Sequence, residues 1–172
     1  MKIKIPGLLL IAIFICHLSY SQAVIKAGHG ISDLKIGNTT DEVEWVLGFR
    51  GLKLMSGGVP EVLKIQADML NIDFDYVYNY QHIMALPIST VYFKNDKVVM
   101  IVVSSYPEYN EILCIGIKTE KGLNFWDNIK DMKKIYGKEP ETKESDFDFY
   151  FYKDIGLSVS VEDDEIRTMS IF

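Results

Sequence analysis

In its second half the chain reads Gly122-Leu-Asn-Phe-Trp-Asp-Asn-Ile-Lys-Asp-Met-Lys-Lys-Ile-Tyr-Gly137, which is the pattern of a short amphipathic helix. Asp127 or Asn128 can cap its start, because a side-chain oxygen there accepts hydrogen bonds from free backbone amides of the first turn. Apolar residues then follow at helical spacing, at Ile129, Met132, Ile135 and Tyr136. Gly137 suits the left-handed conformation in which many helices end. The segment therefore predicts a capped helix that stops at Gly137.

A similar segment lies 89 residues earlier, as the shift from Leu123 back to Leu34 shows. The positions that correspond to the apolar and capping residues of the later helix are Leu34, Ile36, Asn38, Thr40, Val43, Val46, Leu47 and Gly48. Thr40 in place of Ile129 is the weakest match. We expect a first helix over residues 39–47, with Asn38 as its cap. Because sequence typical of strands follows each helix, the pattern favours a repeat of one helix and several strands.

The composition is that of a folded protein. The chain has 172 residues, of which 48% are hydrophobic and 24% are charged. This apolar content is enough for a packed core, which a disordered chain lacks. The length suits one compact domain, or two small repeats that share a core.

Residues 1–21 have the features of a secretory signal peptide. A basic start and an uncharged, mostly aliphatic run over residues 7–16 precede a cleavage site before Gln22. The run is shorter than the ~20 apolar residues that a membrane-spanning helix needs. Cys16 raises the alternative of a lipid anchor, but the large Ile15 precedes it where such signals have a small residue. We therefore expect cleavage, and an exported protein of the periplasm or the extracellular space without a membrane span.

Charge and cysteine content narrow the possible partners. The net charge is −6 for the whole chain and −8 without Lys2 and Lys4 of the predicted signal peptide. An acidic protein is repelled by nucleic acids and by anionic lipids, so we expect neither as a partner. Cys114 is the one cysteine outside the signal peptide, so no internal disulfide can form. Its place in an apolar run predicts a small buried residue.

Several segments outside the helices have the composition and alternation of β-strands. They cover residues 72–80, 88–93, 98–104, 112–119, 147–152, 157–161 and 166–172. Residues 22–35 predict only a glycine-rich lead-in. Residues 51–71 have no counterpart in the second half, and this insertion could hold a short helix. The sequence thus predicts an α+β fold of two repeats, residues 22–119 and 120–172, with helices on one face of a layered antiparallel sheet.

These elements resemble a known family. The helix that ends in Tyr136-Gly137, followed by the strand pattern of residues 150–166, resembles the tandem α/β repeat of the β-lactamase inhibitory protein fold, which small outer-membrane assembly lipoproteins share. The parts of the chain that have this pattern are residues 30–48 and 121–172. The resemblance implies a curved sheet surface that binds other proteins. It carries no functional residue over to this chain, because the pattern specifies only a helix end and strand alternation.

Motifs for catalysis, metals or cofactors are not found in the sequence. His29 and His82 have no cysteine or carboxylate around them at ligand spacing, so each is expected in a loop. The acidic run at residues 162–165 lacks the glycine and the ligand spacing of a calcium loop, and it predicts a solvated turn. Nucleophile elbows and phosphate-binding glycine loops are also missing. We expect no catalytic residues, no metal and no cofactor, and the pattern favours a protein that is not an enzyme.

Tyrosines on the predicted strands are the candidate binding residues, and they are Tyr76, Tyr78, Tyr92, Tyr150 and Tyr152. Tyrosine offers a large contact area and a hydroxyl with few rotatable bonds, which suits interfaces. Strand propensity and core filling are the alternative explanation. If the helices cover the face that contains Phe147, Phe149 and Phe151, alternation places Tyr150 and Tyr152 on the open face.

Two functions remain. The first is a secreted or periplasmic protein-binding module, inhibitor-like or associated with the envelope, that docks a protein on an aromatic sheet face. The second is a small-molecule binder or hydrolase with a pocket between the insertion at residues 51–71 and the sheet. The sequence favours the first.

Overall fold

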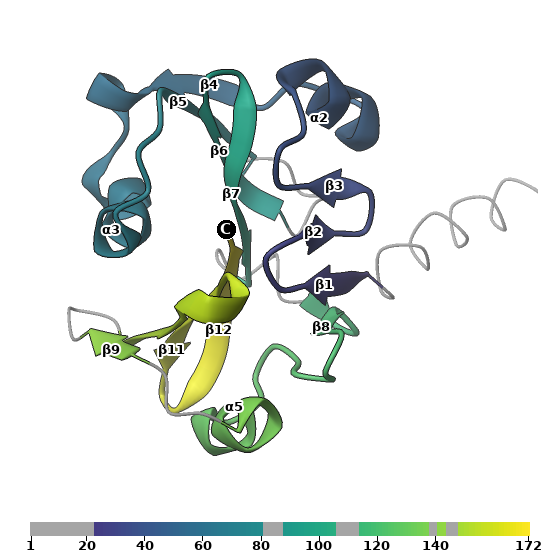
Figure 1. Cartoon of the computed structure of the whole chain (residues 1–172), viewed down its shortest axis with the longest axis vertical. Coiled ribbons are helices and arrows are strands. Elements are labelled where there is room, and N and C mark those ends of the chain that lie inside the picture. The colour runs from purple at the N-terminus through teal and green to yellow at the C-terminus, as the bar shows by residue number, and fades with distance from the viewer. Residues whose placement is uncertain (1–22, 81–87, 106–113, 138–140, 144–147) are drawn as a thin grey trace, which may run out of the picture.

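The computed structural model describes residues 23–80, 88–105, 114–137, 141–143 and 148–172 (Figure 1). The predicted signal peptide, with its cleavage site and Cys16, lies outside these residues, as do His82 and Phe147. None of the described helices has the length and apolar composition to cross a membrane.

One large antiparallel sheet forms the centre of the molecule (Figure 1). Its eight strands lie in the order β4 (Leu52–Met55), β5 (Tyr76–Asn79), β6 (Ile88–Lys94), β7 (Lys97–Ser104), β12 (Glu165–Ile171), β11 (Leu157–Glu162), β10 (Asp148–Tyr152) and β9 (Glu141–Lys143). Each half contributes four consecutive strands, and the two sets join where the last strand of one pairs with the last strand of the other. In that junction Val103 lies opposite Met169 and Ile101 lies opposite Ile171.

The two predicted helices are present, with the predicted ends. α2 (Thr40–Leu47) and α5 (Ile129–Tyr136) both stop at a left-handed glycine, with φ of 79° at Gly48 and 65° at Gly137. Asn128 caps α5 by accepting a hydrogen bond from the amide of Lys130.

The cap of α2 corrects the sequence prediction by one residue. Thr39, not Asn38, is the cap, and its hydroxyl accepts from the amide of Glu42. Glu42 in return accepts from the backbone amide of Thr39 at 2.7 Å, which completes a capping box. Asn38 takes part indirectly, since its side-chain amide donates to the Glu42 carboxylate.

A second, small sheet replaces the predicted lead-in. It has the order β3 (Leu34–Lys35), β2 (Gly30–Ile31), β1 (Val24–Lys26) and β8 (Lys118–Thr119). β1 pairs with β8 in parallel, and the other pairs are antiparallel. Of the strand predicted over residues 112–119 the described part keeps only β8, because Cys114 and the three residues after it form a helical end and turn. Cys114 is fully buried, as predicted.

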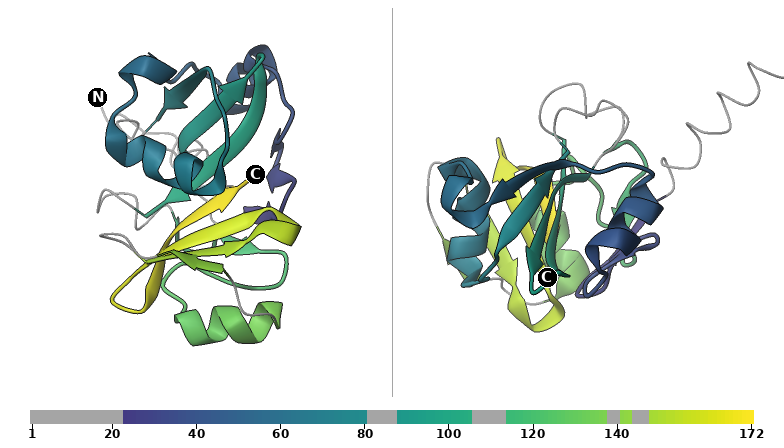
Figure 2. Two further views of the ribbon diagram at one scale, coloured as in Figure 1. Left: turned by 60° about the vertical axis from the view of Figure 1, so that its left-hand side comes forward. Right: turned by 90° about the horizontal axis from the view of Figure 1, so that it is seen from above.

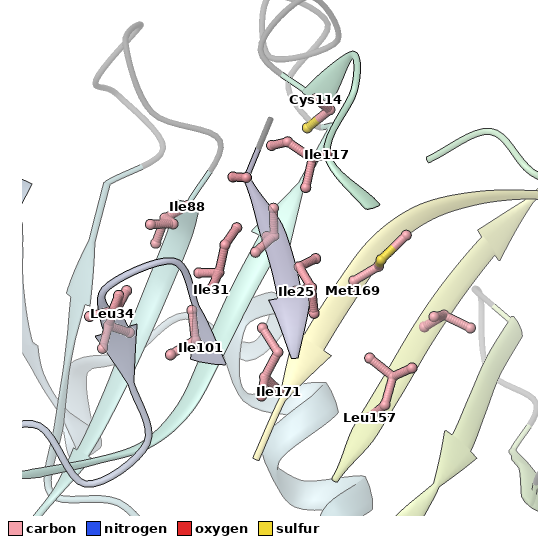
Figure 3. Packing of buried hydrophobic residues seen from close by; sticks show 14 of the residues in the cluster. Ile25, Ile31, Leu34, Ile88, Ile101, Cys114, Ile117, Leu157, Met169 and Ile171 are labelled. Atoms are coloured by element: carbon pink, nitrogen blue, oxygen red, sulfur yellow. The ribbon is translucent and has the colours of Figure 1, made fainter. Parts of the chain in front are cut away.

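The small sheet, α2 and α5 pack on the same face of the large sheet. Figure 3 shows Ile25, Ile31 and Leu34 of the small sheet pointing toward Ile101, Leu157, Met169 and Ile171 of the large one. All of these side chains are buried, and each full burial of such a residue stabilises the fold by roughly 1.5–3 kcal/mol.

The opposite face of the first half is covered by α3 (Glu61–Leu70), which follows the short 3-10 helix η1 (Ser56–Gly58). Leu63 and Ala67 of α3 pack with Tyr92, Met100 and Val102 of the sheet. Seen from above, α3 lies on one side of the large sheet and α2 on the other (Figure 2). A helix within the predicted insertion is thereby confirmed. The two predicted repeat helices, α2 and α5, share one face of the sheet, and α3 lies on the other.

The α+β class predicted from the sequence is confirmed. Each half runs from a helix into four antiparallel strands, with α3 added between the first and second strands of the first half. Among the strands of the large sheet the predicted length differs most at β5, which covers residues 76–79 where the alternation extended over residues 72–80. The interpretation of the two halves as repeats, residues 22–119 and 120–172, stays a prediction.

Candidate functional site

The tyrosines predicted to bind a partner do not form an open surface. Four of them are buried, namely Tyr76, Tyr78, Tyr92 and Tyr152. The fifth, Tyr150, is partly buried. They also lie on different faces of the sheet. Tyr76, Tyr78, Tyr150 and Tyr152 pack in the core under α2 and α5, whereas Tyr92 packs under α3. The hydroxyl of Tyr92 donates to the carbonyl oxygen of Leu63 in that helix.

In β10 the structure exchanges the two faces that the sequence predicted, because the tyrosines and not the phenylalanines lie under a helix. Tyr152 points toward α5, where its ring lies 5.1 Å from the ring of Tyr136. Phe149 and Phe151 lie on the other face and stack on each other with 6.2 Å between ring centroids. Strand alternation correctly puts the two tyrosines of β10 on one face and its two phenylalanines on the other. It does not tell which of these faces a helix will cover. The pattern of Phe and Tyr is apolar enough on both faces to allow either outcome.

Tyr76 has a structural role at the start of α2. Its hydroxyl donates to Oδ1 of Asp96 at 2.8 Å and lies 2.6 Å from the hydroxyl of Thr40. Thr40 also donates to Asp96. The hydrogen bond from Thr40, and to a smaller extent the one from Tyr76, holds the pKa of the Asp96 carboxyl below its usual value. The network therefore ties the first turn of α2 to β5 and to the turn between β6 and β7.

Tyr78 connects the other end of α2 to the sheet. Its hydroxyl donates to Oε1 of Glu44 at 3.2 Å, and Arg50 forms an ion pair with the same carboxylate. The hydrogen bond from Arg50 lowers the pKa of Glu44. Burial raises the pKa of Tyr78 to about 12. The carboxylate of Glu44 and the neutral hydroxyl of Tyr78 are thus both maintained at neutral pH.

The exposed apolar residues gather at one place. Among the described residues five large hydrophobic side chains are exposed, and four of them lie within residues 45–55. These four define the edge patch: Trp45 (84% exposed), Phe49 (38%), Leu52 (54%) and Met55 (59%). The fifth, Ile115, lies elsewhere in the chain and is 59% exposed. Isolated exposed apolar residues are ordinary, but four in one stretch are not.

The edge patch surrounds β4, which is the terminal strand of the large sheet. No described strand pairs with its outer side, so alternate backbone groups of β4 face away from the sheet. The other terminal strand, β9, has the sequence Glu141-Thr-Lys143, and charged residues of this kind discourage pairing with another chain. β4 has the sequence Leu52-Lys-Leu-Met55, in which a single charge stands among three apolar residues.

Packing against a buried tyrosine fixes the position of β4. The ring of Phe49 lies 6.1 Å from the ring of Tyr80, which is fully buried. The next glycine, Gly51, crosses the same ring so closely that a Cβ there would lie 2.9 Å from Cζ of Tyr80. Only glycine allows this approach. The chain can therefore enter β4 directly after α2.

Two features of the sequence lie at this site, but neither predicts it. Trp45 falls one position off the apolar stripe of its helix, which places it away from the core. The segment at residues 51–71 was interpreted as a glycine-interrupted insertion, and the four residues of β4 were too few to show strand alternation.

Two hollows also lie in the surface of the described residues. One, of about 420 Å³, lies beside α3 and is lined by Ser56, Lys64, Asp68, Asn71, Ile72, Asp73 and Phe74. Asp73 in its wall forms an ion pair with Lys94 at 2.8 Å. The other, of about 460 Å³, lies by the loop after β1 and includes His29, Lys121, Tyr136 and Lys153. In the part of the chain that the structure describes, no three histidine, cysteine or carboxylate side chains come together to hold a metal ion.

Comparison of the chain with protein-family models, with curated proteins and with solved structures found no match. The resemblance to the β-lactamase inhibitory protein fold therefore stays a prediction, and the candidate site rests on its own geometry.

Proposed function

We propose that this protein is an exported, non-enzymatic protein-binding module that contacts its partner through the edge patch. The observation that carries the proposal is the gathering of four exposed hydrophobic residues around an open strand edge. The location, periplasmic or extracellular, rests on the N-terminal sequence alone. The inhibitor-like or envelope-associated role expected from the sequence is retained, but the binding residues are now Trp45, Phe49, Leu52 and Met55.

The composition of the edge patch suits a protein interface. Tryptophan and methionine are enriched at such interfaces, and aromatic residues supply many of their binding hot spots. Trp45 is held on a capped helix and is free to be covered, since its side chain contributes almost nothing to the core. Covering a hot-spot residue of this kind is worth about 2 kcal/mol or more, which is roughly thirtyfold in affinity.

The alternative function, a small-molecule binder or hydrolase with its pocket between the insertion and the sheet, has one observation in its favour. The hollow beside α3 lies where that pocket was predicted, and Lys64 and Asp68 line it. A substitution such as Lys64→Ala would separate the alternatives, because it alters this hollow and leaves the edge patch unchanged.

The test is capture followed by measurement with a purified partner. The mature protein, starting at Gln22, is immobilised in three forms: unchanged, Trp45→Ser with Met55→Ser, and Ile115→Ser as the matched control. Proteins from the envelope extract of the source cell that bind the unchanged form are purified, and their affinity for each of the three forms is measured by calorimetry. We expect the double variant to bind at least about thirtyfold more weakly.

The Ile115→Ser control removes an equally exposed apolar residue from another surface. Equal affinity of all three forms for every captured protein would show that the binding surface is elsewhere. Loss of binding with Lys64→Ala alone would favour the pocket instead.

A further inference from the structure

The edge patch extends over both faces of the sheet edge. Met55 lies opposite Tyr76 in the pairing of β4 with β5, so its side chain is on the face that α2 covers. Phe49 lies on the same side, because its ring packs near that of Tyr80. Trp45 lies on that side too, because it belongs to α2. Leu52, by strand alternation, points to the face that α3 covers. A partner that docks flat on one face of the sheet would leave the edge-patch residues of the other face exposed. A segment added along the edge of β4 would cover the residues of both faces.

The backbone of β4 is prepared for such an addition. The amide of Ser56 donates to the carbonyl oxygen of Asp75 in β5 at 2.9 Å. Backbone groups alternate in direction along a strand, so Leu54 also faces β5. Lys53 and Met55 then turn their N–H and C=O groups away from the sheet, toward the side where the structure describes no neighbouring strand.

The charges near β4 indicate the chemistry of the added segment. Within residues 49–60 the only charged residues are Arg50 and Lys53, in a chain whose net charge is −6. Arg50 is paired with Glu44. Lys53 forms no ion pair among the described residues, and its Nζ lies 3.7 Å from the centroid of the Tyr76 ring. Hydrogen bonds, and to a smaller extent the charge of Lys53, lower the pKa of Glu44 and of Asp96. Neither carboxylate forms an ion pair with Lys53, so a carboxylate of a partner can bind the Lys53 ammonium directly.

We infer that the partner contributes an extended segment that pairs with the outer edge of β4 as a ninth strand, with apolar side chains on both faces and an Asp or Glu near Lys53. This inference rests on the proposed function and specifies how the binding occurs. A second copy of this chain fits less well, because its own β4 would set another Lys53 against the first and contains no acidic residue.

Met55 offers a sharp test, because its φ is −70° and proline fits there without strain. Met55→Pro removes the outward N–H and the methionine side chain, and it leaves the hydrogen bonds to β5 in place. Met55→Ala removes only the side chain and keeps the N–H. The two variants therefore separate backbone pairing from side-chain contact.

The probe is a displayed library of short random linear peptides, selected on the unchanged mature protein. We expect the selected peptides to alternate apolar residues and to contain Asp or Glu. Each is then synthesised, and its binding is followed by the fluorescence of the protein's tryptophans. Met55→Pro should weaken binding at least about tenfold relative to Met55→Ala, since it leaves a carbonyl of the peptide unpaired. Lys53→Gln should weaken the binding of acidic peptides and leave the binding of their neutral variants unchanged.

Equal binding of a peptide to Met55→Pro and Met55→Ala would overturn strand addition. If Trp45→Ser still weakened that peptide, the edge patch would remain the binding site, and only the mode of binding would be wrong. Self-association of the unchanged protein at micromolar concentration that Met55→Pro abolishes would identify a second copy as the occupant and overturn the inference.

Discussion

The ring of Tyr136, at the last residue of α5, lies 5.1 Å from the ring of Tyr152 in β10, with an angle of 39° between the two planes. This contact joins the helix to the sheet in the second half of the molecule. It makes Tyr152 a core residue, although the sequence pattern indicated a place on an open surface.

Tyr152→Ala should therefore destabilise the protein. Removing a buried aromatic side chain loses its transfer free energy and leaves a cavity, at a cost of about 3 kcal/mol or more. For a protein of this length that corresponds to a fall of about 6–12 °C in the thermal midpoint. Calorimetry of the variant measures it, and a midpoint within a degree or two of the unchanged protein would show that Tyr152 is not packed under α5.

Two neighbours on α2 provide a matched pair. Leu47 is buried and packs in the main core, whereas Trp45, two residues earlier, is exposed. We expect Leu47→Ala to lower the free energy of unfolding by about 2–5 kcal/mol, and Trp45→Ala to change it by less than about 0.5 kcal/mol. Urea denaturation of both variants checks this. A loss of stability in Trp45→Ala as large as that in Leu47→Ala would mean that Trp45 is packed, and the edge patch would lose its main residue.

The parts of the fold that local chemistry specifies could be predicted from the sequence. Gly48 and Gly137 end their helices because a left-handed residue is needed there, and a cap with the right side chain precedes each helix. The strands of the two hairpins β6–β7 and β11–β12 were placed within about two residues, since apolar runs separated by short polar turns admit few other interpretations.

The rest depends on contacts between distant segments. β1, β2 and β3 have two or three residues each and are strands only because they pair with one another and with β8. The covered face of β10 is decided by where α5 packs. The edge patch could not be predicted because exposure of Trp45 and Leu52 depends on what lies beside β4, and local sequence does not contain that information.

Gly51→Ala should disturb β4. A Cβ at this position would lie 2.9 Å from Cζ of Tyr80 and 3.0 Å from the carbonyl oxygen of Asn79, and the buried tyrosine ring cannot move away. We expect a loss of about 1–3 kcal/mol from overpacking, together with weaker binding at the edge patch. Gly57→Ala is the control, since a Cβ there would meet nothing within 4 Å. It should leave stability unchanged or raise it slightly. Equal stability of the two variants would contradict the close packing of Gly51 on Tyr80.

Tyr78 predicts how stability changes at high pH. Its pKa is raised by burial from 10.0 to about 12 in the folded protein. Below pH 10 the hydroxyl is protonated in both states, so it has no effect on the pH dependence. Between pH 10 and 12 the unfolded chain releases this proton and the folded protein keeps it, so stability falls as the pH rises, by up to about 1.4 kcal/mol per pH unit for this one group.

Tyr78→Phe isolates that contribution. The variant cannot release a proton at this position, so its free energy of unfolding, measured in urea at several values between pH 9 and 12, should decline less steeply than that of the unchanged protein. At neutral pH it should be less stable by roughly 1 kcal/mol, because the hydrogen bond to Glu44 is lost. Burial also raises the pKa of other tyrosines, such as Tyr76. Part of the fall in stability above pH 10 should therefore remain in the variant. Parallel curves above pH 10 would mean that the Tyr78 hydroxyl ionises as readily in the folded protein as in the unfolded chain, and that it is not enclosed between α2 and the sheet.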